Sequence, residues 1–347
     1  MKKIGIAFLV VMTVLSCKNR ENTTENTEAE SNELTVYTHR HYDSDKNIFS
    51  LFEERTGIKV NVVNANADEL IQKMIMEGAQ SPADVLITVD AGRLHRAKTS
   101  DLLQPIESKI INQIVPANLR DPENFWFGIS KRARIIVYAK DRVKPEDLST
   151  YADLASEKWK GRLVMRSSGN IYNQSLLASI IANLGEANAK KWAEGIVKNM
   201  VRDPKGNDRD QVKAIYAGEG DVSIVNSYYV GNMLNSENVE ERTAANGVGI
   251  FFPNQETTGT HINVSGVGVA KYAPNKANAI KFVEFLLSDE AQQIFAESNY
   301  EYPVNKNVSL AETLRNWGRF KEDSINLSIL GENNKKAVLI FDEAGWK

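Results

Sequence analysis

Residues 34–87 decide the fold, because three apolar stretches there alternate with two amphipathic ones. The apolar stretches are LTVYT (34–38), IKVNVV (58–63) and VLI (85–87), and their β-branched residues favour strands. Each amphipathic stretch has apolar residues at helical spacing and ends at a glycine, Gly57 or Gly78, which can terminate a helix. Strand–helix–strand–helix–strand predicts a parallel, doubly wound sheet, so the fold class is α/β.

The remainder of the chain continues this alternation of strands and helices. Further strands are expected at 130–139, 162–165, 222–225 and 263–270, and further helices at 173–183, 190–200, 278–287 and 290–298. We expect Asp43 or Ser44 to cap the first helix and Asp68 to cap the second. A chain of 347 residues with two such α/β stretches predicts two domains.

Composition excludes several classes of function. Hydrophobic residues make up 42% of the chain and charged residues 25%, which is typical of a globular protein. The 42 basic and 45 acidic residues give a net charge of -3, so nothing indicates nucleic-acid binding. The single cysteine, Cys17, excludes an intramolecular disulfide, a cysteine-based zinc site and a protein-held iron–sulfur cluster.

The N-terminus predicts an exported, lipid-anchored protein. A basic start, Met1-Lys2-Lys3, precedes the apolar run 4–15, which is too short to span a bilayer but fits a signal peptide. The run ends in Val14-Leu15-Ser16-Cys17, which resembles the lipobox of bacterial lipoproteins. We therefore expect a signal peptide at 1–16 and, at 17–33, a lipidated Cys17 with a flexible tether that holds the protein to a membrane in the periplasm.

Polar and aromatic clusters follow four of the expected strands. Ligands of open α/β sheets bind beyond the carboxyl ends of strands, so these clusters predict the binding site. The clusters are His39-Arg40-His41-Tyr42, Thr88-Val89-Asp90, Ser167-Ser168-Gly169-Asn170-Ile171-Tyr172 and Asn226-Ser227-Tyr228-Tyr229.

Four tyrosines, at positions 42, 172, 228 and 229, are expected in these polar loops rather than in a core. A phenol is neutral near pH 7, but a bound trivalent cation can remove its proton. Phenolate oxygen is a hard donor that suits Fe³⁺. Four phenolates around Fe³⁺ carry a net charge of about -1, and Arg40 and Arg202 are the arginines expected to neutralise it.

Other interpretations of these residues stay open at this point. Adjacent Tyr228 and Tyr229 are also typical of packing and of surfaces that stack on sugars or peptides. The pair His39 and His41 is similar to half of a zinc site. The glycine pairs at 247 and 249 and at 266 and 268 lack the flanks of a dinucleotide-binding loop, and Asp68-Glu69 fits a helix start better than an acid–base pair.

The chain resembles the periplasmic ferric-ion-binding proteins of bacterial iron ABC importers, the bacterial transferrins, over nearly all of 34–347. A serine and two tyrosines after a buried strand, with an N-terminal His-Tyr, are specific to that family. The stretches that carry the resemblance are LTVYTHRHY (34–42), SPADVLITVDAGR (81–93), WKGR (159–162), SSGNIYN (167–173), GDVSIVNSYY (220–229), SGVGV (265–269) and YPVN (302–305).

The resemblance implies a function and a ligand set. The family binds ferric ion in a cleft, passes it to a membrane permease and catalyses no reaction. Tyr228 and Tyr229 match the paired iron-ligating tyrosines, Tyr172 and Tyr42 match those of a four-tyrosine subgroup, and His41 matches a ligand of some members. Ser168 and Gly169 match a region that binds a synergistic anion in some members. Asp90 is one residue beyond the carboxylate position of another subgroup, so it is not expected to ligate.

The resemblance also implies the architecture, a two-lobed type II periplasmic-binding-protein fold in which crossing hinge strands join two doubly wound sheets. Lobe one is expected at 34–131 plus 266–303, and lobe two at 132–265 plus 304–347. The metal is then expected to dock on the tyrosines of lobe two before the hinge closes and adds Tyr42. The partners implied are iron and the permease subunits, and the protein is expected to be a monomer.

Three rival functions remain. A hydrolase would use Ser167 or Ser168, although neither lies in a G-x-S-x-G motif and no His/Asp set is evident beside them. A receptor for an organic solute would stay colourless with ferric iron. A ferrous-iron receptor would recruit His41 as a nitrogen donor.

Overall fold

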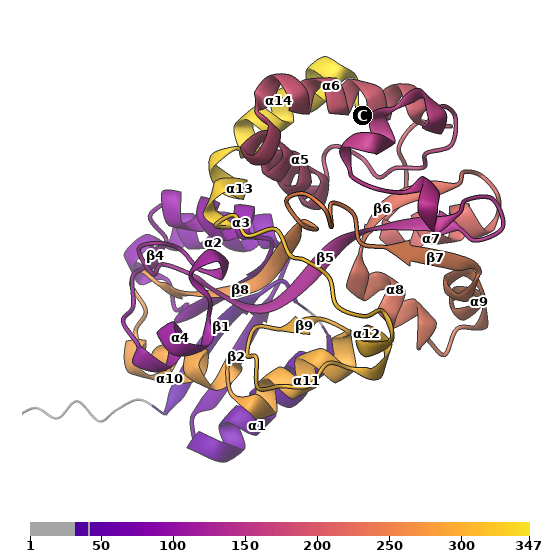
Figure 1. The fold of residues 1–347 in the computed structure, drawn as a ribbon. Coiled ribbons are helices and arrows are strands. Elements are labelled where there is room, and N and C mark those ends of the chain that lie inside the picture. Colours follow the sequence, from indigo (N-terminus) through magenta and orange to yellow (C-terminus); the bar gives the residue numbers. More distant parts are fainter. Residues whose placement is uncertain (1–31, 41) are drawn as a thin grey trace, which may run out of the picture. The chain divides into compact units, whose positions relative to one another are not determined.

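Strand β5 (Phe127–Ala139) organises the fold, which is described here from a computed structural model over residues 32–40 and 42–347. The hydrogen-bonded path of strands is β2-β1-β3-β8-β5-β6. The first part of β5, residues 127–133, pairs with β8, and the second part, residues 134–139, pairs with β6 and β7. One strand therefore belongs to both sheets (Figure 1).

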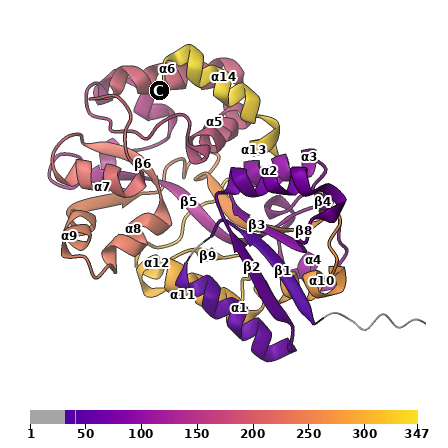
Figure 2. The same ribbon diagram turned by 180° about the vertical axis from the view of Figure 1, so that it is seen from behind.

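The first sheet contains the doubly wound unit predicted from residues 34–87. Strands β1 (Glu33–Thr38), β2 (Lys59–Asn64) and β3 (Val85–Val89) are parallel, and β8 (Ile262–Ala270) runs antiparallel between β3 and β5. The order β2-β1-β3 reverses direction at β1, so right-handed crossovers place α1 (Asp43–Thr56) and α2 (Ala67–Glu77) on opposite faces. Figure 2 shows these two helices on either side of the strands. Two short strands, β4 (Leu103–Gln104) and β9 (Tyr302–Pro303), extend the sheet.

The second sheet is small and antiparallel around β5. Its other strands are β6 (Val222–Asn226) and β7 (Val248–Phe251). The helices that pack on it are α7 (Asp208–Tyr216), α8 (Ser227–Leu234) and α9 (Val239–Gly247). Because β6 runs directly into α8, the residues of the first turn of α8 lie at the carboxyl end of a strand, where ligands of such sheets bind.

The remaining helices pack on the first sheet or on one another. Helices α5, α6 and α14 pack together (Figure 1), and α13 packs against α3 and α5. The bounds of all the remaining helices are α3 (Ala91–Thr99), α4 (Lys109–Ile114), α5 (Ile171–Leu184), α6 (Glu186–Asn199), α10 (Lys276–Leu286), α11 (Asp289–Asn299), α12 (Glu312–Asn316), α13 (Ser328–Glu332) and α14 (Asn334–Ala344). Short 3₁₀ turns are η1 (Gly78–Gln80), η2 (Ala117–Leu119), η3 (Pro145–Asp147), η4 (Ala152–Ala155) and η5 (Glu157–Trp159). Within the described ranges, none of the helices is both long enough and apolar enough to cross a bilayer.

Most of the predicted elements are confirmed within two or three residues at their ends, but the strand predicted at 162–165 is wrong. Only Leu163 pairs there, through isolated parallel bridges to Met200 and Val222. The backbone on either side bonds to Val222 of β6, because the Val164 N–H donates to the Val222 carbonyl and the Val222 N–H donates to the Arg162 carbonyl, but the pairing does not extend beyond Leu163. The segment is therefore a buried connection and not a strand.

Both predicted helix caps are also wrong. The N-cap of α1 is Tyr42, which has an extended backbone and makes no side-chain cap, and Asp43 is the first helical residue. The N-cap of α2 is Asn66, which forms a capping box with Glu69. The acidic residues of each first turn are therefore inside the helix, where the positive end of the helix dipole favours them. For α1 this places Tyr42 directly before the first turn of the helix.

Candidate metal site

The four tyrosines lie at the N-termini of three helices and not in the polar loops that the sequence predicted. Tyr42 is the N-cap of α1, Tyr172 is the second residue of α5, and Tyr228 and Tyr229 are the second and third residues of α8. Asn170 fixes the start of α5, because its side chain accepts a 3.1 Å hydrogen bond from the Tyr172 N–H. Helix N-termini carry partial positive charge, so all four positions favour an anionic phenolate.

The structure brings the four side chains together. The rings of Tyr228 and Tyr229 stack with centroids 4.2 Å apart. Tyr228 also shares side-chain hydrogen bonds with Tyr42 and with Tyr229. A charge on Tyr172 raises the pKa of each of the other three phenols, so its hydroxyl lies close to theirs. The tyrosines therefore converge from three helices on one place.

Burial favours the protonated form of three of these phenols by raising the pKa of Tyr42, Tyr228 and Tyr229. Burial is the largest cause that raises the pKa of Tyr228 well above its usual value of 10, and charges on Tyr172 and Tyr42 add to it. Burial also raises the pKa of Tyr42, where the carboxylate of Glu301 adds to the effect and Arg40 opposes it. A cation that binds here must therefore displace phenolic protons, which a hard trivalent ion can do.

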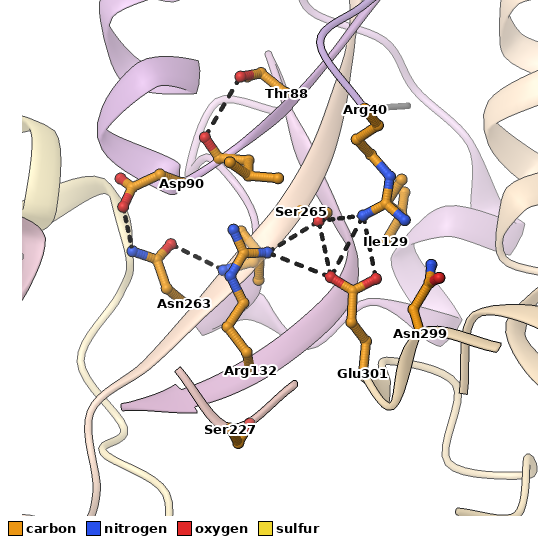
Figure 3. A network of polar contacts seen from close by, with 12 residues as sticks. Arg40, Thr88, Asp90, Ile129, Arg132, Ser227, Asn263, Ser265, Asn299 and Glu301 are labelled. Carbon is orange, nitrogen blue, oxygen red and sulfur yellow. Dashed lines mark hydrogen bonds and ion pairs between the residues drawn. The ribbon is translucent and has the colours of Figure 1, made fainter. Parts of the chain in front are cut away.

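Arg40 lies beside Tyr42, as the sequence predicted. Its Cζ is 5.0 Å from the centroid of the Tyr42 ring, and its guanidinium pairs with Asp45 at 3.0 Å. It also pairs with Glu301 at 3.1 Å (Figure 3). Burial alone would lower the pKa of Arg40, but the charges of Asp45 and Glu301 outweigh burial and raise it. Arg40 is therefore a fixed cation next to one of the four phenols.

Arg132, on β5, is a second arginine at this place that the sequence reasoning missed. It is 1% exposed, donates a 2.9 Å hydrogen bond to Ser265 and lies 3.7 Å from Glu301 (Figure 3). Its Cζ is 6.0 Å from the centroid of the Tyr172 ring, and its charge lowers the pKa of Tyr228. Among the described residues its Nε and Nη2 have no hydrogen-bond partner. A buried cation with free donors suits a site that becomes anionic.

Arg166 takes the place that the sequence assigned to Arg202. The Cζ of Arg166 is 5.6 Å from the centroid of the Tyr172 ring. Burial would lower the pKa of Arg166, but the charge and hydrogen bond of Asp208 raise it, and charges on Tyr229 and Tyr172 add to the rise. Arg202 instead pairs through Nε with Glu219 at 2.9 Å, so the structure does not bring it to the tyrosines. The signal for Arg166 was its position directly before SSGNIYN (167–173), whereas in SKRAR (130–134) no local signal distinguishes Arg132 from Arg134.

Of the other candidate residues, Asp90 and His39 have polar partners within the protein, and His41 and Cys17 lie outside the described residues. Asp90 is fully buried, and its carboxylate accepts hydrogen bonds from Ser175 at 2.7 Å and Asn263 at 2.9 Å. His39 Nδ1 lies 3.3 Å from the hydroxyl of Thr88. His41 and Cys17 are not among the residues that the structure describes.

In the region expected to bind an anion, the backbone N–H groups of Ser168 and Gly169 donate hydrogen bonds to other groups of the protein. The Ser168 N–H donates to the carbonyl of Lys347 at 3.0 Å, and the Gly169 N–H donates to the Ser167 hydroxyl at 3.2 Å. Over 32–40 and 42–347, no cluster of three or more histidine, cysteine, aspartate or glutamate side chains could hold a metal ion. The phenols are therefore the donor set that this place offers, and their chemistry fits Fe³⁺.

Comparison with known proteins agrees with this chemistry. The model of the family described as bacterial extracellular solute-binding protein matches residues 80–322. The chain is 48% identical to "Iron uptake protein A1" of Synechocystis, over 99% of this chain and 97% of that protein. It is 28% identical to the "Major ferric iron-binding protein" of Neisseria meningitidis, over 91% of this chain and 93% of that protein.

Solved structures show the same fold. The Trichodesmium protein IdiA (FutA), in complex with iron and citrate ligands, is 52% identical with a TM-score of 0.89, over 91% of this chain and all of that one. The "Ferric binding protein from Campylobacter jejuni" is 47% identical with a TM-score of 0.86, over 90% of this chain and all of that one. The fold is the two-lobed type II fold that the sequence predicted. The chain belongs to the bacterial extracellular solute-binding protein family and, within it, to the periplasmic ferric-ion-binding proteins of iron importers.

Proposed function

We propose that this protein binds ferric iron through the phenolate oxygens of Tyr42, Tyr172, Tyr228 and Tyr229 and delivers it to the permease of an ABC importer. The observation that carries the proposal is that the four tyrosines lie at three helix N-termini, where the rings of Tyr228 and Tyr229 stack and buried arginines lie against the rings of Tyr42 and Tyr172. Hard oxygen donors select a hard cation, and relatives named for ferric iron share the fold. His41 and a small anion are candidates for further coordination positions.

Fixed cations make four phenolates tolerable in one buried place. Four phenolates around Fe³⁺ leave a net charge of about -1. The guanidinium groups of Arg40, Arg132 and Arg166 each lie within 6.0 Å of the centroid of a tyrosine ring. Their carboxylate partners are also buried, so the protein holds these charges in place before iron arrives. Such preorganisation lowers the cost of ionising the phenols.

The division into lobes extends the proposal to the order of binding. Residues 34–131 and 266–303 form lobe one, and residues 132–265 and 304–347 form lobe two. Lobe two then carries Tyr172, Tyr228 and Tyr229, and lobe one carries Tyr42. Iron docks on the three tyrosines of lobe two, and closure about β5 and β8 adds Tyr42.

Absorption spectroscopy tests the metal. Purified protein mixed with ferric citrate should develop a visible phenolate-to-iron charge-transfer band, which is lost when Tyr228 and Tyr229 are both replaced by phenylalanine. Ferrous iron added without oxygen should give no such band, which separates the ferric from the ferrous function. A protein that stays colourless with ferric citrate, and binds an organic solute instead, would overturn the proposal.

Anchoring through Cys17 is a separate proposal with its own test. Cys17 lies outside the described residues, so the proposal depends on the sequence Val14-Leu15-Ser16-Cys17 alone. Cells that express the protein should incorporate labelled palmitate into it, and Cys17→Ser should abolish the label and move the protein to the soluble fraction. Unchanged fractionation of Cys17→Ser would refute the anchor without affecting the iron site.

A further inference from the structure

Helices α8 and α11 meet directly behind the tyrosines. The side-chain amide of Asn232, on α8, donates two hydrogen bonds. One goes to the Tyr228 carbonyl at 2.8 Å, and the other goes to the Asn299 carbonyl, at the end of α11, at 3.0 Å. One amide group therefore ties the first turn of α8, which carries Tyr228 and Tyr229, to a helix of the proposed lobe one.

The contact continues from Asn299 to the helix that begins at Tyr42. The hydroxyl of Ser44 donates a 3.0 Å hydrogen bond to the side-chain carbonyl of Asn299. Ser44 is the second residue of α1, two positions after Tyr42. Figure 3 shows Asn299 beside Glu301, which pairs with Arg40. Asn299 thus joins the first turn of α1 to the first turn of α8.

The backbones also approach closely at this contact. A Cβ atom on Gly231 would lie 2.6 Å from the Cβ of Tyr300, closer than such atoms come in proteins. Tyr300 has φ 55°, a left-handed conformation that a non-glycine residue adopts only where its surroundings require it. A close helix crossing and a strained residue at one contact indicate that its geometry matters for function.

We infer that Asn232 and Asn299 are positioning residues that hold Tyr42 against Tyr228 and Tyr229 in the closed protein and so slow the release of iron. The inference rests on the proposed function and on the proposed lobes. Neither asparagine is assigned as a ligand. Their role is to set the separation between the two parts of the ligand set, because a single bridging amide bonds to both.

The chain offers a matched control in Asn235, one turn further along α8. Its amide donates to the Gly231 carbonyl at 2.8 Å and to the Thr313 hydroxyl at 3.0 Å. Asn232→Leu and Asn235→Leu therefore each remove one bond to the carbonyl four residues earlier and one bond to another element. Thr313 belongs to the proposed lobe two, so only Asn232→Leu breaks a contact between the lobes.

The readout is the rate at which iron-loaded protein loses its visible band to excess chelator. We expect Asn232→Leu to release iron roughly tenfold faster than the parent, the factor that loss of one hydrogen bond gives, and Asn235→Leu to match the parent. The band itself should keep its wavelength in Asn232→Leu, because the ligands are unchanged. Asn232→Gln, which restores a donor, should recover much of the slow release. Equal release rates for Asn232→Leu and the parent would overturn the inference.

A second variant pair tests the same contact without removing a hydrogen bond. Gly231→Ala should wedge the helices apart against Tyr300 and speed release. Adding Tyr300→Gly removes the opposing Cβ and should restore slow release. If Gly231→Ala holds iron as long as the parent, the contact does not control retention. A parent protein that shows no band at all would instead refute the proposed function, so the two failures are distinguishable.

Discussion

The ring of Tyr228 stacks on the ring of Tyr229, with centroids 4.2 Å apart and planes 29° apart. Successive residues of an α-helix point about 100° apart around its axis, so neighbours seldom face one another. Here the two residues occupy the first turn of α8, and their rings nevertheless stack on one another. The pair can therefore present two phenol oxygens to one ion, and this arrangement supplies the first prediction.

Removing a phenol oxygen should weaken iron binding according to its place in the site. We expect Tyr228→Phe and Tyr229→Phe to lower ferric affinity by more than roughly 100-fold, since changes even to groups behind a metal ligand cost about 10- to 100-fold. Tyr42→Phe should bind more weakly than the parent but keep its visible band, because three phenols remain. Competition with a ferric chelator of known affinity measures each constant.

The matched control for these variants is Tyr302→Phe. Tyr302 is also buried, burial raises its pKa, and its hydroxyl has no hydrogen-bond partner among the described residues. Its loss should therefore leave both affinity and fold unchanged. If Tyr42→Phe bound iron as tightly as the parent, Tyr42 would not be a ligand and the proposed order of binding would be wrong.

Iron affinity should fall as the pH falls. Burial holds the pKa of Tyr228 and Tyr42 above the usual value, so the metal-free phenols are protonated at and below neutral pH. Each phenolate formed releases one proton, and the logarithm of the affinity should therefore rise with pH with a slope approaching about four. Iron retention titrated from neutral to acidic pH measures the slope. A flat profile would contradict phenolate ligation.

The metal-free protein should lose stability in alkali, and Tyr228 should account for part of the loss. The folded state raises the pKa of Tyr228 above the unfolded value of about 10, so the folded state binds the proton more tightly. That stabilisation is complete below pH ~10 and disappears as the pH rises through the raised pKa. Denaturant unfolding at pH 8 and pH 11 should show a smaller decrease for Tyr228→Phe than for the parent. Equal decreases would show that Tyr228 ionises freely.

Arg166 should contribute to iron binding and Arg202 should not. Arg166→Met removes the cation beside Tyr172, but it leaves Asp208 paired with Arg134 at 2.7 Å, so the fold should survive. Ferric affinity should drop by roughly 10-fold, within the range for groups that support a metal ligand. Arg202→Met removes the pair with Glu219 and a hydrogen bond to the Asp203 carbonyl, and it should bind like the parent. The reverse ranking, measured by chelator competition, would restore the role that the sequence suggested for Arg202.

Arg40 should be essential to the fold as well as to the site. Its removal in Arg40→Met leaves Asp45 and Glu301 buried without their shared cation, which should cost about 3–5 kcal/mol of unfolding free energy. Arg55→Met breaks the exposed pair with Glu290 and should leave the unfolding midpoint unchanged. Urea titration of the two metal-free variants makes the comparison. A small loss for Arg40→Met would mean that the two carboxylates find other partners.

Local pattern predicted six of the described strands and six of the described α-helices, and it singled out the four tyrosines, because strands, helices and the residues after strand ends leave signals in nearby sequence. It did not predict β7 or helices α7, α8 and α9. The prediction erred at Leu163, where a buried apolar segment resembles a strand but pairs only through isolated bridges to Met200 and Val222. It also placed Tyr228 in a loop, because the first turn of a helix is as polar as a loop. Neither error moved a tyrosine away from the site.

The arginines show where sequence reasoning stops. Arg202 and Arg166 are equally cationic in sequence, and only tertiary contacts decide that one pairs with Glu219 and the other with Asp208 beside Tyr172. Arg132 was missed because nothing local distinguishes it from Arg134, two residues on along the same strand. The contact between Asn232 and Asn299 joins residues 67 positions apart and has no sequence signal at all.

Strand β5 makes the halves of this receptor inseparable. Its first residues, 127–133, complete one sheet through β8, and its last, 134–139, form the centre of the other between β6 and β7. A cut anywhere along it would leave at least one half with bare backbone hydrogen-bonding groups and a tendency to aggregate. We therefore expect that neither half of the receptor folds when it is expressed without the other, because each sheet needs its part of β5.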